Sequence, residues 1–137
     1  MSSGFAVPNR LANPLLRRVL RSPLGARAGR RLAVLRYTGR RTGQRHELVV
    51  QYARDGTTVW VLVGAADRKT WWRNLVEPAQ VELWLAGEHL RARALAVPGD
   101  ADPEACAAGL AVYRRVAPSA PVLPAGVVLV RADVILS

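Results

Sequence analysis

From residue 31 onward, apolar and polar side chains alternate with a period of two, the pattern of strands that have one buried face. Three such runs follow one another at 31–38, 44–53 and 58–63, and short glycine-containing turns separate them. The Asp55-Gly56 pair between the second and third runs is typical of a tight hairpin turn. The pattern predicts an antiparallel sheet and excludes a fold built mainly from helices.

Further runs at 80–86 and 89–97 predict a second hairpin around Gly87-Glu88, and 126–135 predicts a last strand. Three helices are expected, each after a residue that can cap it: 13–21 after Asn13, 71–77 after Thr70, and 104–116 after Asp102. About six strands interrupted by single helices predict an α+β fold, mainly antiparallel β, in the form of a small closed or split barrel. We expect one domain over residues 1–137, with residues 1–9 flexible.

The positive charge is unevenly distributed along the chain. Twenty basic and ten acidic residues give a net charge of +10, yet residues 1–45 hold eleven arginines and no acidic residue. Such a field favours a polyanionic ligand, which can be nucleic acid, anionic lipid or a phosphorylated cofactor. A general preference for arginine over lysine explains the residue type but not the asymmetry. Nucleic acid is disfavoured, because no helix-turn-helix or RNA-binding motif is present.

Several classes of protein lack their usual signatures here. A single cysteine, Cys106, allows no internal disulfide, and two histidines 43 residues apart predict no metal site. No Walker, GxGxxG or GxSxG motif occurs. Because no apolar run reaches the length of a membrane span and no signal peptide is recognisable, we expect a cytoplasmic protein. The basic amphipathic helix at 13–21 either packs on its own domain or contacts an anionic membrane at the inner surface.

Two motifs carry candidate chemistry. The first is a turn bracketed by Gly39 and Gly43, in which arginine forks and backbone N–H groups suit phosphate and carboxylate oxygens, although a solvated basic turn would look the same. The second is the segment Trp71-Trp72-Arg73-Asn74-Leu75. Adjacent tryptophans on a short helix point about 100° apart, so one can fill the core while the other lines a cleft. Two core tryptophans remain the alternative.

Together these motifs resemble the deazaflavin-dependent nitroreductase and quinone reductase family. The resemblance rests on Tyr-Thr-Gly-Arg-Arg-Thr-Gly-Gln (37–44), on Trp-Trp-Arg-Asn-Leu (71–75) and on the helix start at Asn13-Pro14, and it covers roughly residues 9–97. It implies a split β-barrel of the FMN-binding type. It also implies a site for coenzyme F-420, an 8-hydroxy-5-deazaflavin with a phosphodiester-linked lactyl-glutamate tail, with FMN as the second choice.

Carried over residue by residue, the resemblance implies that the turn holds the anionic tail, and that the next strand, the loop after 58–63 and the tryptophan segment complete the cleft. The implied cofactor-binding residues are Arg40, Arg41, Thr42, Gln44, Arg45, His46, Val49, Val50, Val63, Gly64, Ala65, Trp71 and Asn74. No catalytic residue is identified. The cofactor supplies the hydride in such proteins, while the protein orients and desolvates the reactants.

The implied function is hydride transfer from the reduced deazaflavin to a quinone, a nitro compound or an activated alkene, which makes a small apolar or aromatic substrate the second partner. The tyrosines that nitroreductase members place near their C-terminal substrate site have no counterpart in 117–121. A non-catalytic split-barrel protein that binds a lipid, a fatty acid or the cofactor is the alternative function. A homodimer is left open.

Overall fold

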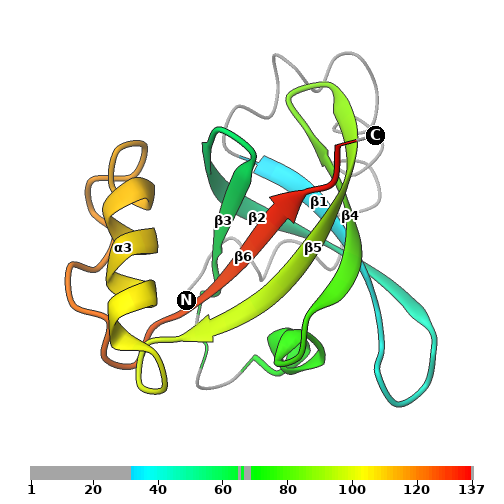
Figure 1. Cartoon of the computed structure of the whole chain (residues 1–137), viewed down its shortest axis with the longest axis horizontal. Coiled ribbons are helices and arrows are strands. Elements are labelled where there is room, and N and C mark those ends of the chain that lie inside the picture. The colour runs from blue at the N-terminus through cyan, green and yellow to red at the C-terminus, as the bar shows by residue number, and fades with distance from the viewer. Residues whose placement is uncertain (1–31, 65, 67–68, 137) are drawn as a thin grey trace.

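The computed structural model describes residues 32–64, 66 and 69–136, so the predicted helix at 13–21, the segment 1–9 and Ala65 lie outside the described residues. Six antiparallel strands close into a barrel in the order β1-β2-β3-β6-β5-β4 (Figure 1), which confirms the predicted mainly antiparallel split-barrel class. The strands are β1 (Leu32–Thr38), β2 (Arg45–Asp55), β3 (Thr58–Leu62), β4 (Ala79–Leu85), β5 (Glu88–Pro98) and β6 (Val128–Val134).

The two long strands, β2 and β5, each change partner along their length. The first part of β2 pairs with β1 up to Gln51, and its last four residues pair with β3. In the same way β5 pairs first with β4 and then with β6. The pairings of β1 with β4 and of β3 with β6 close the ring. The barrel therefore consists of two halves that share β2 and β5.

Alternating side chains of the strands fill the barrel interior, as the period of two predicts. On β3, for example, Val59 and Val61 point inward and are fully buried, and Val63 follows them into the same cluster. Outside the barrel, Trp60 lies in a second apolar cluster beneath a helix. Where β2 and β3 meet, Gly56 has a φ of 63°, which suits the predicted hairpin turn.

The helix α3 (Pro103–Tyr113) packs on the outside of the barrel, against the half formed by β3 and β6 (Figure 1). Its predicted cap is confirmed, since the Asp102 carboxylate accepts a hydrogen bond from the Ala105 N–H. Cys106 and Tyr113 are buried against the barrel. At Gly109 the helix comes so close that an added Cβ would lie 2.6 Å from the Trp60 ring. The helix ends at Tyr113 rather than near 116, because tighter turns lead into Pro118.

A row of charged side chains crosses the outer face of β2, β1 and β4. The Arg36 guanidinium donates to Glu47 over 2.8 Å and to Glu82 over 3.1 Å, and His89 lies 2.8 Å from the other Glu82 oxygen. Burial raises the pKa of Glu82, but the contacts with His89 and Arg36 outweigh it and leave that pKa below its ordinary value. Cross-strand ion pairs of this kind favour the observed register.

None of the helices in the described part of the chain is both long and apolar enough to cross a membrane.

Candidate functional site

The turn between β1 and β2 is held by its own backbone. The Gly39 N–H donates to the Gln44 carbonyl and the Gly43 N–H to the Gly39 carbonyl, each over 2.8 Å. Gly43 has a φ of 72°, a conformation that glycine adopts without strain. The Thr42 hydroxyl accepts from the Gln44 N–H over 3.2 Å. These bonds leave the side chains of residues 40 and 41 exposed to solvent on a shaped turn.

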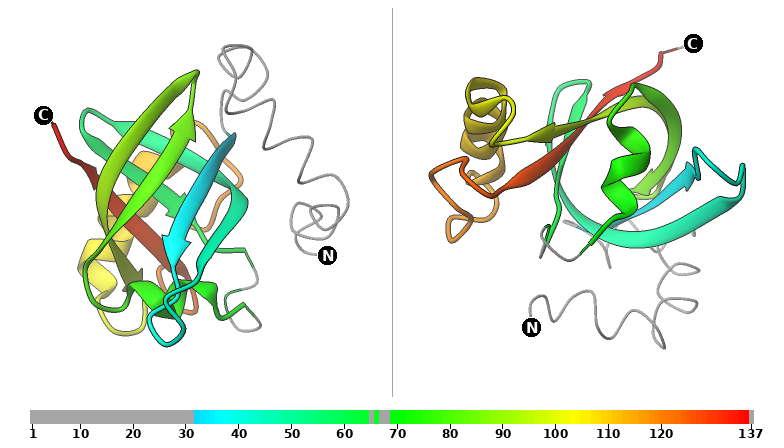
Figure 2. Two further views of the ribbon diagram at one scale, coloured as in Figure 1. Left: turned by 90° about the vertical axis from the view of Figure 1, so that its right-hand side faces the viewer. Right: turned by 90° about the horizontal axis from the view of Figure 1, so that it is seen from below.

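The tryptophan segment forms a short 3-10 helix, η1 (Trp71–Leu75), rather than the longer helix expected to residue 77. Thr70 makes no side-chain cap; its carbonyl instead accepts from the Arg73 N–H over 3.0 Å. Leu75 is buried in the barrel core, and Figure 2 (right) shows η1 lying across the end of the barrel. Both tryptophans are partly buried against that core, so neither interpretation of the pair holds in its simple form.

The two tryptophans make different contacts. The Trp71 ring lies 5.9 Å from the Tyr37 ring, which in turn stacks on His46 at 5.2 Å. The Trp72 indole N–H donates to the Lys69 carbonyl over 2.8 Å. Burial raises the pKa of Tyr37, so its phenol stays neutral beside the site. The aromatic stack joins the start of η1 to both strands that carry the turn.

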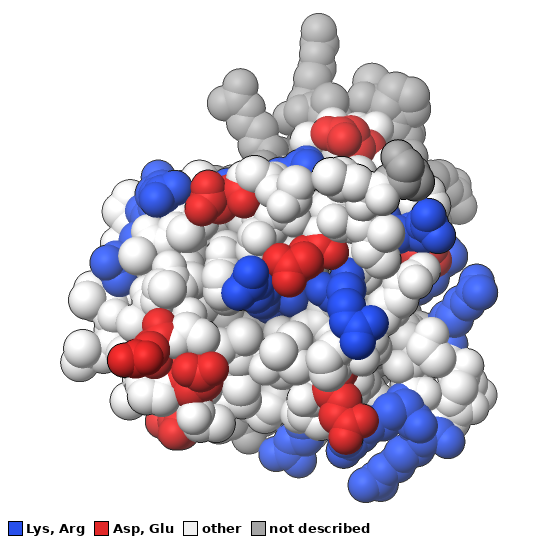
Figure 3. All heavy atoms as spheres, in the orientation of Figure 1, with Lys and Arg blue, Asp and Glu red and all other residues white. Residues whose placement is uncertain are grey.

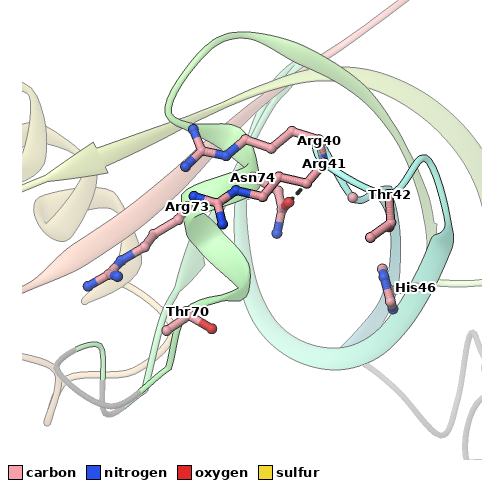
Figure 4. A pocket seen from close by; sticks show the side chains of 8 residues that line it. Arg40, Arg41, Thr42, His46, Thr70, Arg73 and Asn74 are labelled. Carbon is pink, nitrogen blue, oxygen red and sulfur yellow. Dashed lines mark hydrogen bonds between the residues drawn. The ribbon is translucent and has the colours of Figure 1, made fainter.

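The turn and η1 are the two walls of an open pocket of about 360 Å³ (Figure 4). Among the predicted residues, the structure brings Arg40, Arg41, Thr42, His46 and Asn74 together around it. It adds three residues that were not among the implied cofactor-binding residues: Gly39, Thr70 and Arg73. We name this the turn pocket. None of its eight lining residues is acidic.

The remaining predicted residues lie around the turn pocket rather than in it. Arg45 lines a separate hollow on the outer face with Arg36 and Arg91. Val50 and Val63 are buried in the barrel interior, whereas Val49 points outward and packs with Val34. The other predicted residues with described positions are the exposed Gln44 and Gly64 and the partly buried Trp71.

Three guanidinium groups of the turn pocket have no carboxylate partner among the described residues: those of Arg40, Arg41 and Arg73. Arg36, by contrast, has two, and its hydrogen bond with Glu47 raises its pKa above the ordinary value. Figure 4 shows the three unpaired groups extending in the same direction from the two walls. Figure 3 shows basic side chains gathered at its lower right, over the end of the molecule where the turn lies. Guanidinium forks without partners suit phosphate or carboxylate oxygens.

Arg73 is the residue of the site that sequence reasoning missed. Its guanidinium lies 5.6 Å from the centre of the Trp72 ring, in the range of a cation–π contact. The available signal was its position directly before Asn74 and after the two tryptophans. On a short helix, however, an arginine looks like part of a solvated face, and only the fold places it at the same pocket as Arg40 and Arg41.

The closed six-strand barrel with a helix across its end defines a split β-barrel protein. Its fold is similar to that of a protein described as a domain-swapped dimer, with 12% identity, a TM-score of 0.55 and coverage of 92% of this chain and 99% of the other. A Listeria innocua protein, provisionally described as a pyridoxamine 5'-phosphate oxidase, has 12% identity and a TM-score of 0.55, and the match covers 92% of this chain and 94% of the other. A protein of unknown function from Agrobacterium tumefaciens str. C58 has 21% identity and a TM-score of 0.50, and the match covers 88% of this chain and 54% of the other. At such identities the likeness shows the fold alone.

The sequence itself identifies the family. Residues 15–117 match the F420H2-dependent quinone reductase family, and the chain belongs to it. This confirms the resemblance drawn from the two motifs, and it makes F-420 the cofactor, with FMN secondary. No curated protein sequence matches the chain.

Proposed function

We propose that the turn pocket binds the anionic tail of F-420 and that the protein reduces a quinone. The observation that supports the site is a set of three guanidinium groups that have no carboxylate partner in the described part of the chain and that extend from two walls around a pocket without an acidic residue. A tail with a phosphodiester and glutamate carboxylates matches this set in charge and in hydrogen-bonding type. The donors therefore fit the cofactor that family membership requires.

Each part of the site has a proposed task. Arg40, Arg41 and Arg73 hold phosphate or carboxylate oxygens, and the Thr42 and Thr70 hydroxyls offer further hydrogen bonds. The His46 ring nitrogens can add a hydrogen bond. When bound, reduced F-420 supplies a hydride. The chain then orients the ring system and shields it from water, and we expect the predicted residue Gly64, which follows β3, to lie beside it.

The proposed acceptor is a quinone rather than a nitro compound or an activated alkene. Reduction of a quinone to a hydroquinone needs one hydride and one proton. It needs no covalent bond between the substrate and a residue of the protein. The segment 117–121, where the tyrosines of nitroreductase members are missing, follows α3 beside the barrel, whereas η1 lies across the barrel end (Figures 1 and 2). Tyr113, at the end of α3, is fully buried in the contact of the helix with the barrel. These positions favour the simpler acceptor.

The test is a titration with F-420 followed by tryptophan fluorescence. The Arg40→Ala and Arg41→Ala variants should each weaken binding about tenfold, the loss expected for one charge-assisted hydrogen bond at an exposed site. Arg114→Ala removes an equal charge beyond α3 and serves as the matched control, with unchanged affinity expected. Binding should weaken as salt is raised. Equal losses in all three variants would show a non-specific charge effect and contradict the assigned site.

A non-catalytic role as a lipid or fatty-acid carrier is not favoured by this pocket, because charged and polar side chains dominate its lining. Mass spectrometry of solvent-extracted protein tests that role, and a stoichiometric co-purified lipid would revive it. Dimerisation is a separate proposal, supported by the similar fold of a protein described as a domain-swapped dimer. Light scattering during size-exclusion chromatography measures it directly, and a mass of 14.9 kDa would contradict it.

A further inference from the structure

The turn and η1 are joined by the side chain of Asn74, which uses both ends of its amide. Its Oδ1 atom accepts a hydrogen bond from the Arg40 backbone N–H over 3.0 Å, and its Nδ2 group donates to the Trp71 carbonyl over 2.8 Å. Figure 4 shows the first bond running between the two walls of the turn pocket. Within the described residues, it is the one hydrogen bond that connects the turn with η1.

The geometry points to Asn74 as a positioning residue, which fixes the distance between the arginines of the turn and Arg73 before any ligand arrives. The inference rests on the proposed function for its ligand. One N–H of the Asn74 amide and one lone pair of its Oδ1 atom are engaged within the protein, so we assign the residue to the wall of the turn pocket.

The rest of the contact network explains why one bond can have this effect. Trp71, whose carbonyl receives the Asn74 amide, lies against Tyr37, and Tyr37 stacks on His46 at the base of the turn. Trp71 is thus anchored to the strands, and Asn74 extends that anchor to the exposed part of the turn at Arg40. A site whose walls are fixed in advance loses less freedom when a charged ligand binds. Without the amide, the turn would keep its internal hydrogen bonds but lose its fixed position relative to η1.

The experiment compares Asn74→Leu, which removes both hydrogen bonds at similar size and without charge, with the wild-type chain. In the ligand-free protein, hydrogen exchange of the Arg40 amide, followed by NMR, should become about fivefold faster, since one net hydrogen bond is lost. The affinity for F-420 should fall by a similar factor. Slow exchange at the buried Val61 of β3 reports that the barrel is still folded.

Two further variants test the positioning role of Asn74. Val76→Ala, a change at the exposed residue that follows η1, is the matched control and should alter neither measurement. Asn74→Asp keeps an acceptor for the Arg40 N–H but loses the donor to the Trp71 carbonyl, so the exchange rate of that amide should lie between those of the wild type and Asn74→Leu. A purely structural role in the barrel would not produce this difference between the leucine and aspartate variants.

The outcomes separate this inference from the proposed function. Unchanged exchange at Arg40 in Asn74→Leu overturns the positioning role, and so does faster exchange with undiminished affinity for F-420. If the wild-type chain does not bind F-420 while Asn74→Leu exchanges faster at Arg40, the proposed function fails and the positioning of the turn stands.

Discussion

Replacing Gly109 by alanine sets two opposing effects against each other. In the interior of a helix this change usually stabilises by about 1 kcal/mol, because glycine loses more backbone freedom on folding. In α3, however, the new Cβ would lie 2.6 Å from two atoms of the Trp60 ring and 2.6 Å from a methyl group of Leu129. Carbon atoms pack at about 3.5–4.0 Å, so the helix must shift by roughly 1 Å.

Overpacking of this kind costs about 1–3 kcal/mol, so the steric term outweighs the gain in helix propensity. We expect Gly109→Ala to lower the free energy of unfolding by about 1 kcal/mol and the melting temperature by about 3 °C. Thermal and urea unfolding followed by circular dichroism measure both quantities. Ala108→Gly, at an exposed position of the same helix, serves as the control and should cost about 1 kcal/mol through propensity alone.

A double variant tests the assigned cause. Trp60→Phe should destabilise the chain by itself, because it leaves unfilled space beneath α3. Combined with Gly109→Ala, it should cost less than the two single losses together, since the smaller ring makes room for the added methyl group. A Gly109→Ala protein that is as stable as the wild type would refute the reasoning, because it would mean that α3 yields without cost.

Three other outcomes can be checked with the same protein. Ala86 has a φ of 49°, so Ala86→Asn, which creates an Asn-Gly hairpin turn, should raise the melting temperature by about 2–4 °C in a calorimeter. His89 and Arg36 hold the pKa of Glu82 below its ordinary value. Their contacts with Glu82 therefore stabilise the fold above the unfolded-state pKa of about 4.3, and this contribution is lost as pH falls through the folded-state pKa. Acid titration should therefore show a shallower loss of stability in Glu82→Gln, and parallel curves would contradict the assignment. Burial raises the pKa of Cys106, so a thiol reagent should modify it only after denaturation; rapid labelling of the native protein would show that α3 opens readily.

The hairpins could be predicted because their information is local. Asp55-Gly56 and the residues around Gly87 fix two turns, and alternation assigns the faces of the strands they join. The pairings of β1 with β4 and of β3 with β6 join segments far apart in the sequence, and no turn residue encodes them. They follow from how the two hairpins bury their apolar faces together, which only the folded chain reveals.

The sequence indicated Arg40 and Arg41 as residues of the site because they combine positive charge with a glycine-bracketed turn, and both line the turn pocket. The neighbours Val49 and Val50 show a limit of residue-by-residue transfer, because consecutive strand residues point to opposite faces. Val50 enters the barrel and Val49 faces away from it. Arg73 was missed for the opposite reason, since its relevance depends on how η1 lies against the turn.

The exchange of partners along β2 and β5 has a consequence for how the molecule opens. The turn pocket belongs to the half that contains β1, whereas α3 covers the half formed by β3 and β6. The inward side chains of all six strands form one apolar cluster, whereas α3 packs on a second cluster outside the barrel. Local unfolding follows such contiguous units, so α3 can open without disturbing the part of the barrel that holds the turn pocket. Selection for a new acceptor, or for tighter binding of the cofactor tail, can therefore change residues of the half that contains β1, while α3 and its buried contacts preserve global stability.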